Sequence, residues 1–145
     1  MSKKQATIKT RLVRHEDGPQ LVTLFKELTT DPINLQIETV ISDENCHAIV
    51  LENEDGSVIG FGALAIHLIP IKGYVGRIED VIVQEAFRGQ GLGERLLDTL
   101  IEIARKQEIA NITLNSSPKR IAARNLYLKK GFYLRDTGVF RLDLK

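Results

Sequence analysis

Residues 87–97 have the sequence FRGQGLGERLL, in which three glycines alternate with Gln90 and Leu92. Glycine loses more backbone entropy on folding than any other residue, so three of them in five positions indicate a geometric requirement. The leucines that follow predict a helix, and the first N–H groups of a helix have no partner within it. Because the helix dipole adds positive charge there, the loop predicts a phosphate or pyrophosphate site, and Arg88 adds a suitable donor.

The sequence of this loop does not match either of two better-known phosphate-binding motifs. A Walker loop needs Lys and then Ser or Thr after its last glycine, whereas Gly93 is followed by Glu94 and Arg95. A dinucleotide fingerprint needs its third glycine three residues after the second, and Glu94 occupies that place. The structural alternative is a tight turn that only allows a strand and a helix to pack closely.

The composition is that of one globular domain. The chain has 145 residues, 43% of them hydrophobic and 27% charged, with a formal net charge of +1. We therefore expect a single domain over residues 1–145, without nucleic acid or a membrane as partner. The start, MSKKQATIKT, has no apolar run typical of a secretory signal, so we expect a cytoplasmic protein. Cys46 is the single cysteine and the three histidines show no ligand spacing, so we expect no metal.

Hydrophobic periodicity predicts the order β-α-α-β-β-β-α-β-α-β-β. The predicted strands cover residues 6–13, a hairpin over 47–69 that turns at 54–57, and residues 73–83, 110–115, 132–136 and 139–144. The predicted helices cover residues 18–30, a short stretch within 32–43, residues 92–106, and 117–130 with Ser117 as N-cap. The apolar end of 73–83 is expected to be buried on both faces. This order indicates an α+β fold with one mixed sheet and helices on both faces.

Two landmarks resemble the GNAT acetyltransferases. Residues 88–93 match the family pattern (Gln or Arg)-x-x-Gly-x-(Gly or Ala), and ARNLYLKKGF at 123–132 resembles its helix with Tyr four residues before Gly-Phe. The order of elements is similar over nearly the whole chain. The segment GRIEDVIVQEAFRGQGLG at 76–93 is especially similar to the glucosamine-phosphate N-acetyltransferases. Residues 114–127 depart from that branch, which has Asp-Cys after the fifth strand and Asn where Ala123 stands.

The resemblance implies the GNAT-type acyl-CoA N-acyltransferase fold, with acetyl-CoA as co-substrate and its pyrophosphate in the glycine loop. The pantetheine arm would then run along the end of the strand at 73–83, as an added strand would. Lys119 and Arg120 could face the CoA phosphates, or they could be solvated surface charges. The implied CoA-binding residues are Val81, Ile82, Val83, Arg88, Gly89, Gln90, Gly91, Leu92, Gly93, Glu94, Asn115 and Arg120.

Tyr127 occupies the position of the family's general acid, and a phenol can protonate the departing CoA thiolate. Its alternative is a helix residue with its ring in the core and its hydroxyl in water. Glu79 and Asp80 are adjacent on a strand, so their side chains should point to opposite faces, Glu79 with Val83 and Asp80 with Ile82. We expect Glu79 to be the base that the amine needs. Its alternatives are an acceptor-binding carboxylate and an exposed residue without a role.

Two hypotheses follow. One is an N-acetyltransferase in which the amine attacks acetyl-CoA directly in a ternary complex; the other is a non-catalytic acyl-CoA-binding module. The presence of both Tyr127 and Glu79 favours the enzyme. The acceptor stays open among an amino sugar with or without phosphate, a peptide or protein amine, a polyamine and an aminoglycoside. The expected acceptor-binding residues are Glu79, Asp80 and Arg141.

The apolar residues in the last predicted strand favour pairing with a second chain, so we expect a homodimer. In the glucosamine-phosphate relatives this part of the chain joins two subunits. The resemblance places Arg141 near a phosphate-binding arginine that comes from the partner.

Overall fold

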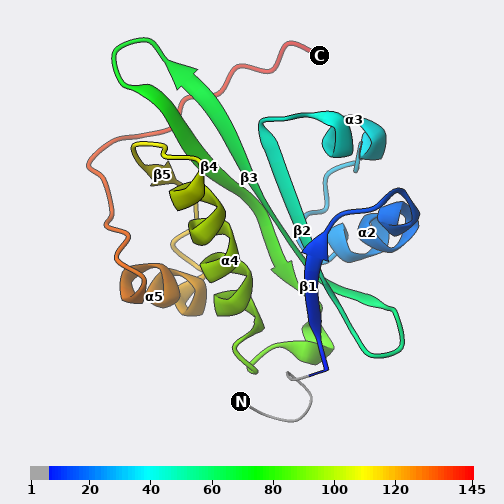
Figure 1. Ribbon diagram of the computed structural model, residues 1–145. Coiled ribbons are helices and arrows are strands. Elements are labelled where there is room, and N and C mark those ends of the chain that lie inside the picture. Colours follow the sequence, from blue (N-terminus) through cyan, green and yellow to red (C-terminus); the bar gives the residue numbers. More distant parts are fainter. Residues whose placement is uncertain (1–6) are drawn as a thin grey trace. The chain divides into compact units, whose positions relative to one another are not determined.

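A five-stranded mixed sheet organises the first part of the computed structural model, which describes residues 7–145 (Figure 1). The strands lie in the order of the sequence, the first four antiparallel and the last parallel to its neighbour. They are β1 (Lys9–Leu12), β2 (Cys46–Glu52), β3 (Val58–Ile69), β4 (Gly73–Val83) and β5 (Ile112–Thr113). The chain divides into two compact units, residues 1–114 and 115–145, which are described separately.

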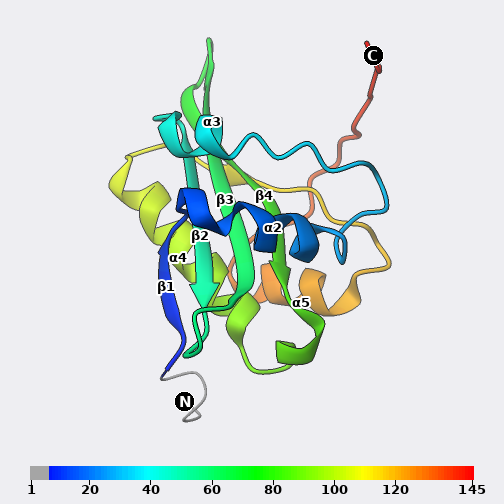
Figure 2. The same ribbon diagram turned by 90° about the vertical axis from the view of Figure 1, so that its right-hand side faces the viewer.

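Helices cover both faces of the sheet in the first unit, as the pattern predicted. α2 crosses one face of strands β2 to β4, and α4 lies on the other face (Figure 2). The helical segments of this unit are η1 (His15–Asp17), α2 (Gly18–Phe25), α3 (Ile37–Ser42), η2 (Glu85–Phe87) and α4 (Leu92–Lys106). The second unit holds α5 (Ile121–Lys129). The α+β class is therefore confirmed.

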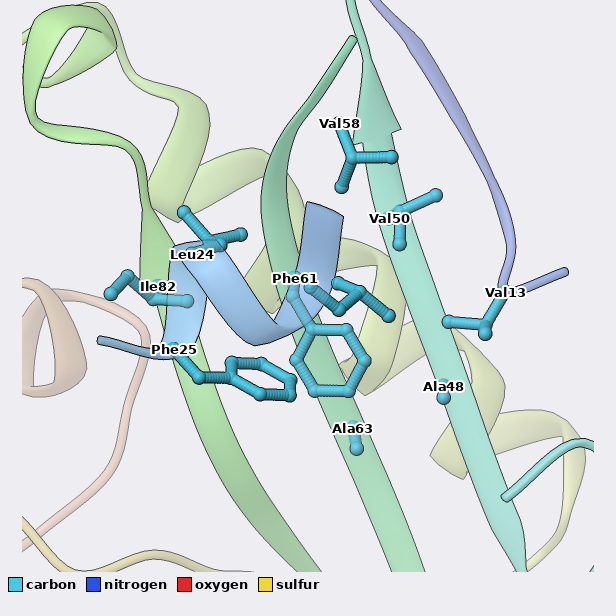
Figure 3. Close-up of a cluster of buried hydrophobic side chains, with 10 residues drawn as sticks. Val13, Leu24, Phe25, Ala48, Val50, Val58, Phe61, Ala63 and Ile82 are labelled. Carbon is cyan, nitrogen blue, oxygen red and sulfur yellow. The ribbon is translucent and has the colours of Figure 1, made fainter. Parts of the chain in front are cut away.

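The core between α2 and the sheet is apolar (Figure 3). Leu21, Leu24 and Phe25 recur at helical spacing, which turns them all toward the sheet. The rings of Phe25 and Phe61 meet edge to face, with centroids 4.9 Å apart, the arrangement that the aromatic quadrupole favours. The buried members are Val13, Leu21, Leu24, Phe25, Ala48, Val50, Val58, Phe61, Ala63 and Ile82.

α4 packs on the opposite face through one apolar stripe, and its bounds agree with the predicted helix. The stripe consists of Leu92, Leu96, Leu97, Leu100 and Ala104, all buried. A Cβ on Gly62 of β3 would lie 3.1 Å from Leu100 Cδ1. The bare backbone of β3 at this position therefore allows α4 to approach closely.

Several predicted ends were wrong although the elements exist. The helix predicted at 18–30 ends at Phe25, and the strand predicted at 110–115 is observed only at Ile112–Thr113. The strand at 6–13 is observed as Lys9–Leu12, and its first residue lies outside the described residues. The last helix begins at Ile121 and not after Ser117, because Arg120 N donates to Ser117 O and closes a separate turn.

The two closing strands predicted at 132–136 and 139–144 are not strands in the structure. Their apolar side chains are exposed: Tyr133, Leu134, Val139, Phe140, Leu142 and Leu144. An alternating pattern gives a segment the preference for extended structure, but a strand forms only when a neighbour completes its hydrogen bonds. The alternating residues therefore favour an extended backbone, but no strand among the described residues pairs with this segment.

A buried ion pair joins β1 to η1. Asp17 is the one charged side chain among the buried residues of the described chain. Both its oxygens accept from Arg11, at 2.8 Å each, and Oδ2 also accepts from Arg14 N at 2.8 Å. Arg11 Nε donates to Glu52 on β2 at 2.6 Å. Burial opposes ionisation of Asp17, but the hydrogen bonds from Arg11 and Arg14 N outweigh it and hold the pKa of Asp17 below its usual value.

Substituting Asp17→Ala should lower the free energy of unfolding at pH 7 by about 2–4 kcal/mol, because it removes the acceptor of two Arg11 hydrogen bonds and of Arg14 N, although Arg11 keeps its contact with Glu52. A lowered carboxyl pKa stabilises the fold above the unfolded pKa of about 3.9 and loses that contribution as pH falls through the folded pKa. The difference between wild type and variant should therefore shrink below about pH 4 in urea titrations. Glu16→Gln, on an exposed neighbour, is the control. A difference that stays constant down to pH 2 would contradict the ion-pair account.

Candidate active site

The glycine loop has the backbone geometry that its sequence predicts. Gly89 and Gly91 have φ of 80° and 79°, in the left-handed region that glycine adopts without strain. Gly91 is the N-cap of α4, and the bond from Arg95 N to Gly91 O starts the helix. The amides of Leu92 and Gly93 thus precede the helical ladder. A Cβ on Gly93 would meet no protein atom within 4 Å, so the helix surface is open at this residue.

The outer edge of β4 is open beside this loop. β5 pairs with β4 at only two positions among the described residues, Gly76 and Arg77. On the other side, Gln84 N donates to Ile59 O at 2.8 Å, so the backbone groups of Val83, one residue earlier, face away from β3. The backbone of residues 78–83 on this edge has no strand partner in the first unit, and a ligand that carries amide groups can pair with such an edge, where Val83 O already accepts from Arg88 Nε at 2.8 Å.

The expectation that the end of β4 is buried on both faces was wrong. Ile82 is buried, whereas Val81 and Val83 are half-buried.

A β-bulge in β4 overturns the expected alternation of Glu79 and Asp80. Glu79 pairs with Ala63 and Ile82 pairs with Phe61, so two residues of β4 face the single Gly62 of β3. The extra residue shifts the alternation by one position, because paired side chains lie on the same face. Glu79 therefore shares the α2 face with Ile82, not a face with Val83.

Glu79 and Asp80 differ in their surroundings. Glu79 Oε1 lies 2.5 Å from Arg77 Nε, and both side chains are about two-fifths exposed, at 43% and 41%. Asp80 sits in the bulge with φ of 55°, a rare value for a residue other than glycine. Desolvation of its carboxyl raises the pKa of Asp80 above the usual value, although the residue as a whole is exposed. Both carboxylates thus lie at the strand edge, one ion-paired and one strained.

The Arg88 side chain turns back toward β4. Its Nε donates to Val83 O at 2.8 Å, and Nη2 lies 3.4 Å from Glu27 Oε1 in the turn after α2. The same oxygen of Glu27 accepts from Glu85 N at 2.9 Å. Glu27 is the site residue that the sequence did not indicate. It lies 58 residues before Glu85, so no local pattern could reveal the contact.

In the second unit, a Schellman motif explains the spacing of the Tyr-Gly-Phe landmark. Gly131 N donates to Leu128 O at 3.1 Å and Phe132 N to Tyr127 O at 3.0 Å, with φ of 96° at Gly131. The Tyr127 and Phe132 rings lie 6.0 Å apart, the hydrophobic contact that accompanies this motif. The landmark therefore fixes the last turn of α5, where Tyr127 is half-buried.

The other predicted site residues of this unit are exposed. Asn115 and Arg120 precede α5, and Arg141 Nε donates to Asp143 at 2.7 Å. The structure thus brings together the glycine loop, the β4 edge, Glu79 and Asp80 within residues 7–114. Tyr127, Asn115, Arg120 and Arg141 belong to residues 115–145.

The described residues contain no group of three or more His, Cys, Asp or Glu side chains that could hold a metal ion. Among the same residues, no helix has the length and apolar character needed to cross a membrane.

Comparisons with known proteins agree with this geometry. The model of the acetyltransferase (GNAT) family matches residues 12–132. The chain is 37% identical to a glucosamine 6-phosphate N-acetyltransferase of Trypanosoma brucei brucei over 94% of this chain and 96% of that protein. A crystal structure of a Trypanosoma brucei acetyltransferase superposes with a TM-score of 0.78 at 30% identity, covering 94% of this chain and 99% of that one. Glucosamine-6-phosphate N-acetyltransferase from Arabidopsis thaliana shares the fold, with a TM-score of 0.83 at 22% identity over 94% of this chain and 98% of that one.

The chain belongs to the GNAT acetyltransferase family. It is an acetyl-CoA-dependent acyltransferase. The expected enzyme class is confirmed.

Substituting Gly93→Val should weaken CoA binding about tenfold or more, because the side chain would fill the space where a phosphate approaches the amide. The free energy of unfolding should change by only about 1 kcal/mol or less, since the added Cβ meets no protein atom within 4 Å. Calorimetric titration with CoA and urea unfolding measure the two effects. Gly91→Val is the matched comparison, because its φ of 79° makes valine strained and lowers stability as well. Unchanged CoA affinity in folded Gly93→Val would contradict the assignment of a phosphate-binding site to this loop.

Proposed function

We propose that this enzyme transfers the acetyl group of acetyl-CoA to the amine of glucosamine 6-phosphate. The observation that carries the proposal is the 37% identity to the trypanosomal protein of that name over nearly the full length of both chains. Of the amine acceptors that the sequence left open, the two sugars and a peptide amine are compared in the experiment below.

In this proposal the two open features of the first unit hold acetyl-CoA. The pyrophosphate lies over the amides of residues 89–94, where the dipole of α4 favours an anion. The pantetheine arm pairs with the backbone of residues 81–83 along the edge that β5 leaves open. Asn115 and Arg120, which are exposed in the second unit, are proposed as additional contacts to CoA.

The transfer is a direct attack in a ternary complex. The amine nitrogen attacks the thioester carbon, a C–N bond forms, the C–S bond breaks, and the sulfur leaves as a thiolate. An ordinary thiol has a pKa of about 8.5, so the thiolate is a tolerable leaving group, and protonation prevents the reverse reaction. We assign that proton to the Tyr127 hydroxyl. Glu79 takes the proton that the amine loses, directly or through water, and Asp80 binds the acceptor.

Substituting Tyr127→Phe should lower kcat by a factor of about 10² to 10⁴, the range for general acid–base groups, and leave the Kd of CoA unchanged. Phenylalanine keeps the ring that contacts Phe132, so the end of α5 is preserved. Release of free thiol measures turnover, and calorimetry measures CoA binding. Gly131→Ala serves as the control for damage to the helix end, since its φ of 96° disfavours alanine. Equal turnover in wild type and Tyr127→Phe would assign the proton to water or to another group.

The last residues of the chain suggest how the acceptor phosphate is bound. The exposed apolar side chains at 133–144 would be covered if the segment paired with a second copy of the chain, and we propose a homodimer on this basis. Arg141 belongs to this segment, and its guanidinium suits a phosphate monoester. It would then reach the acceptor site of the partner subunit.

The value of kcat/KM should be higher for glucosamine 6-phosphate than for glucosamine in the wild type, and Arg141→Ala should remove most of that preference. Loss of one charge-assisted phosphate contact corresponds to about 10- to 100-fold in kcat/KM. Sedimentation velocity on both proteins checks that the dimer is retained. Activity on a peptide amine but on neither sugar would redirect the proposal to a protein acceptor. If Arg141→Ala still prefers glucosamine 6-phosphate to glucosamine, Arg141 does not bind the acceptor phosphate.

A further inference from the structure

We propose that Glu27 and Arg88 form a clamp that positions the glycine loop, and that the Arg88 guanidinium is a positioning group and not a phosphate ligand. The clamp consists of the Glu27 carboxylate, the Glu85 amide, the Arg88 guanidinium and the Val83 carbonyl. The inference rests on the proposed acetyl-CoA site, because it concerns how that site is held in shape.

Glu27 connects the turn after α2 to the segment that leads into the loop. Its backbone is fixed by the bond from Glu27 N to Leu24 O at 3.0 Å. From this position Oε1 accepts from Glu85 N at 2.9 Å and lies 3.4 Å from Arg88 Nη2. The side chains of Glu27 and Arg88 are 31% and 51% exposed, so the contact lies at the surface. One carboxylate in the turn after α2 therefore contacts both the first residue of η2 and the residue that follows η2.

Arg88 closes the segment on its other side. Its Nε donates to Val83 O, the last carbonyl of β4, at 2.8 Å. Within this segment Phe87 N donates to Gln84 O at 2.9 Å. Residues 83–88 thus form a closed turn, and the left-handed Gly89 follows it directly. The clamp therefore fixes the direction in which the chain enters the glycine loop. It thereby also fixes the orientation of the backbone N–H groups in the loop.

Direct binding of a phosphate by Arg88 makes the opposite prediction for Glu27. A carboxylate near the polyphosphate of CoA repels it, so removing that charge from a simple phosphate site should tighten CoA binding. If the carboxylate instead holds the loop in its binding geometry, removing it should weaken CoA binding. The sign of the change therefore separates the two roles of Arg88.

The experiment measures the Kd of CoA by calorimetry and the KM of acetyl-CoA by thiol release in single and double variants. Glu27→Ala and Arg88→Ala should each weaken binding about three- to tenfold, as expected for one hydrogen-bonded contact. The double variant should bind CoA as tightly as the single variant with the lower affinity, because both changes open the same clamp. The KM of acetyl-CoA should rise by the same factor with kcat nearly unchanged.

Conservative variants sharpen the result. Glu27→Gln keeps an oxygen acceptor for Glu85 N, so it should retain most of the affinity. Arg88→Lys keeps the charge but loses the guanidinium fork that reaches both Val83 O and Glu27, so it should resemble Arg88→Ala. Glu16→Gln, an exposed carboxylate outside the clamp, is the matched control for removing one negative charge. Hydrogen exchange of residues 84–91 without CoA should become faster in Glu27→Ala.

Weaker CoA binding in both alanine variants, without further loss in the double variant, would support the clamp. Unchanged or tighter binding in Glu27→Ala would overturn it, as would full CoA affinity in Arg88→Lys. A wild type that binds no CoA would overturn the proposed function, and with it the assignment of the clamp to CoA. In that case hydrogen exchange still decides whether Glu27 orders the loop.

Discussion

The unequal pairing of β4 with its two neighbours is the constraint on which the first unit depends. β4 follows β3 over nearly its whole length but meets β5 only at Gly76 and Arg77. One edge of the strand is therefore paired along nearly its whole length, while β5 leaves the other edge without a strand partner from residue 78 onward, where Arg88 Nε donates to Val83 O. Strand edges of this kind are normally covered, and an extended ligand with amide groups can complete the missing hydrogen bonds.

The bulge and the glycine loop both act on this exposed edge. The extra residue at Asp80 changes which side chains face α2, so that Glu79 points to the same face as Ile82. Two residues after Val83, the last residue of the strand, η2 begins and turns the chain toward Gly89 and the start of α4. The strand and the turn after it thus lead from Glu79 and Asp80 to the glycine loop at 89–93. This is the order in which an acceptor amine, a pantetheine arm and a pyrophosphate would lie.

Contacts between distant segments hold this arrangement in place. Arg11 and Asp17 tie β1 to η1 at the start of α2, and Glu27 ties the other end of that helix to the turn after β4. α2 is therefore fixed at both ends by carboxylate contacts and along its length by Leu21, Leu24 and Phe25. In the second unit, the Schellman motif at Gly131 has the same effect on the last turn of α5, which carries Tyr127.

The sequence by itself determined the elements whose signals are local. The alternation in 47–69 with its turn, and the stripe from Leu92 to Ala104, depend on neighbours within a few residues, and the glycines at 89 and 91 need φ values that other residues avoid. The GNAT family could be recognised from these same local features. Only the tertiary structure decided the face of Glu79, the contact between Glu27 and Glu85 N, and the absence of strands at 132–144. Each of these depends on a residue from another segment: an opposing strand for the bulge, a helix end for the clamp, and a pairing partner for the closing segment. Periodicity along one chain carries no information about such partners, because it records only which way a side chain would point if the neighbour were present.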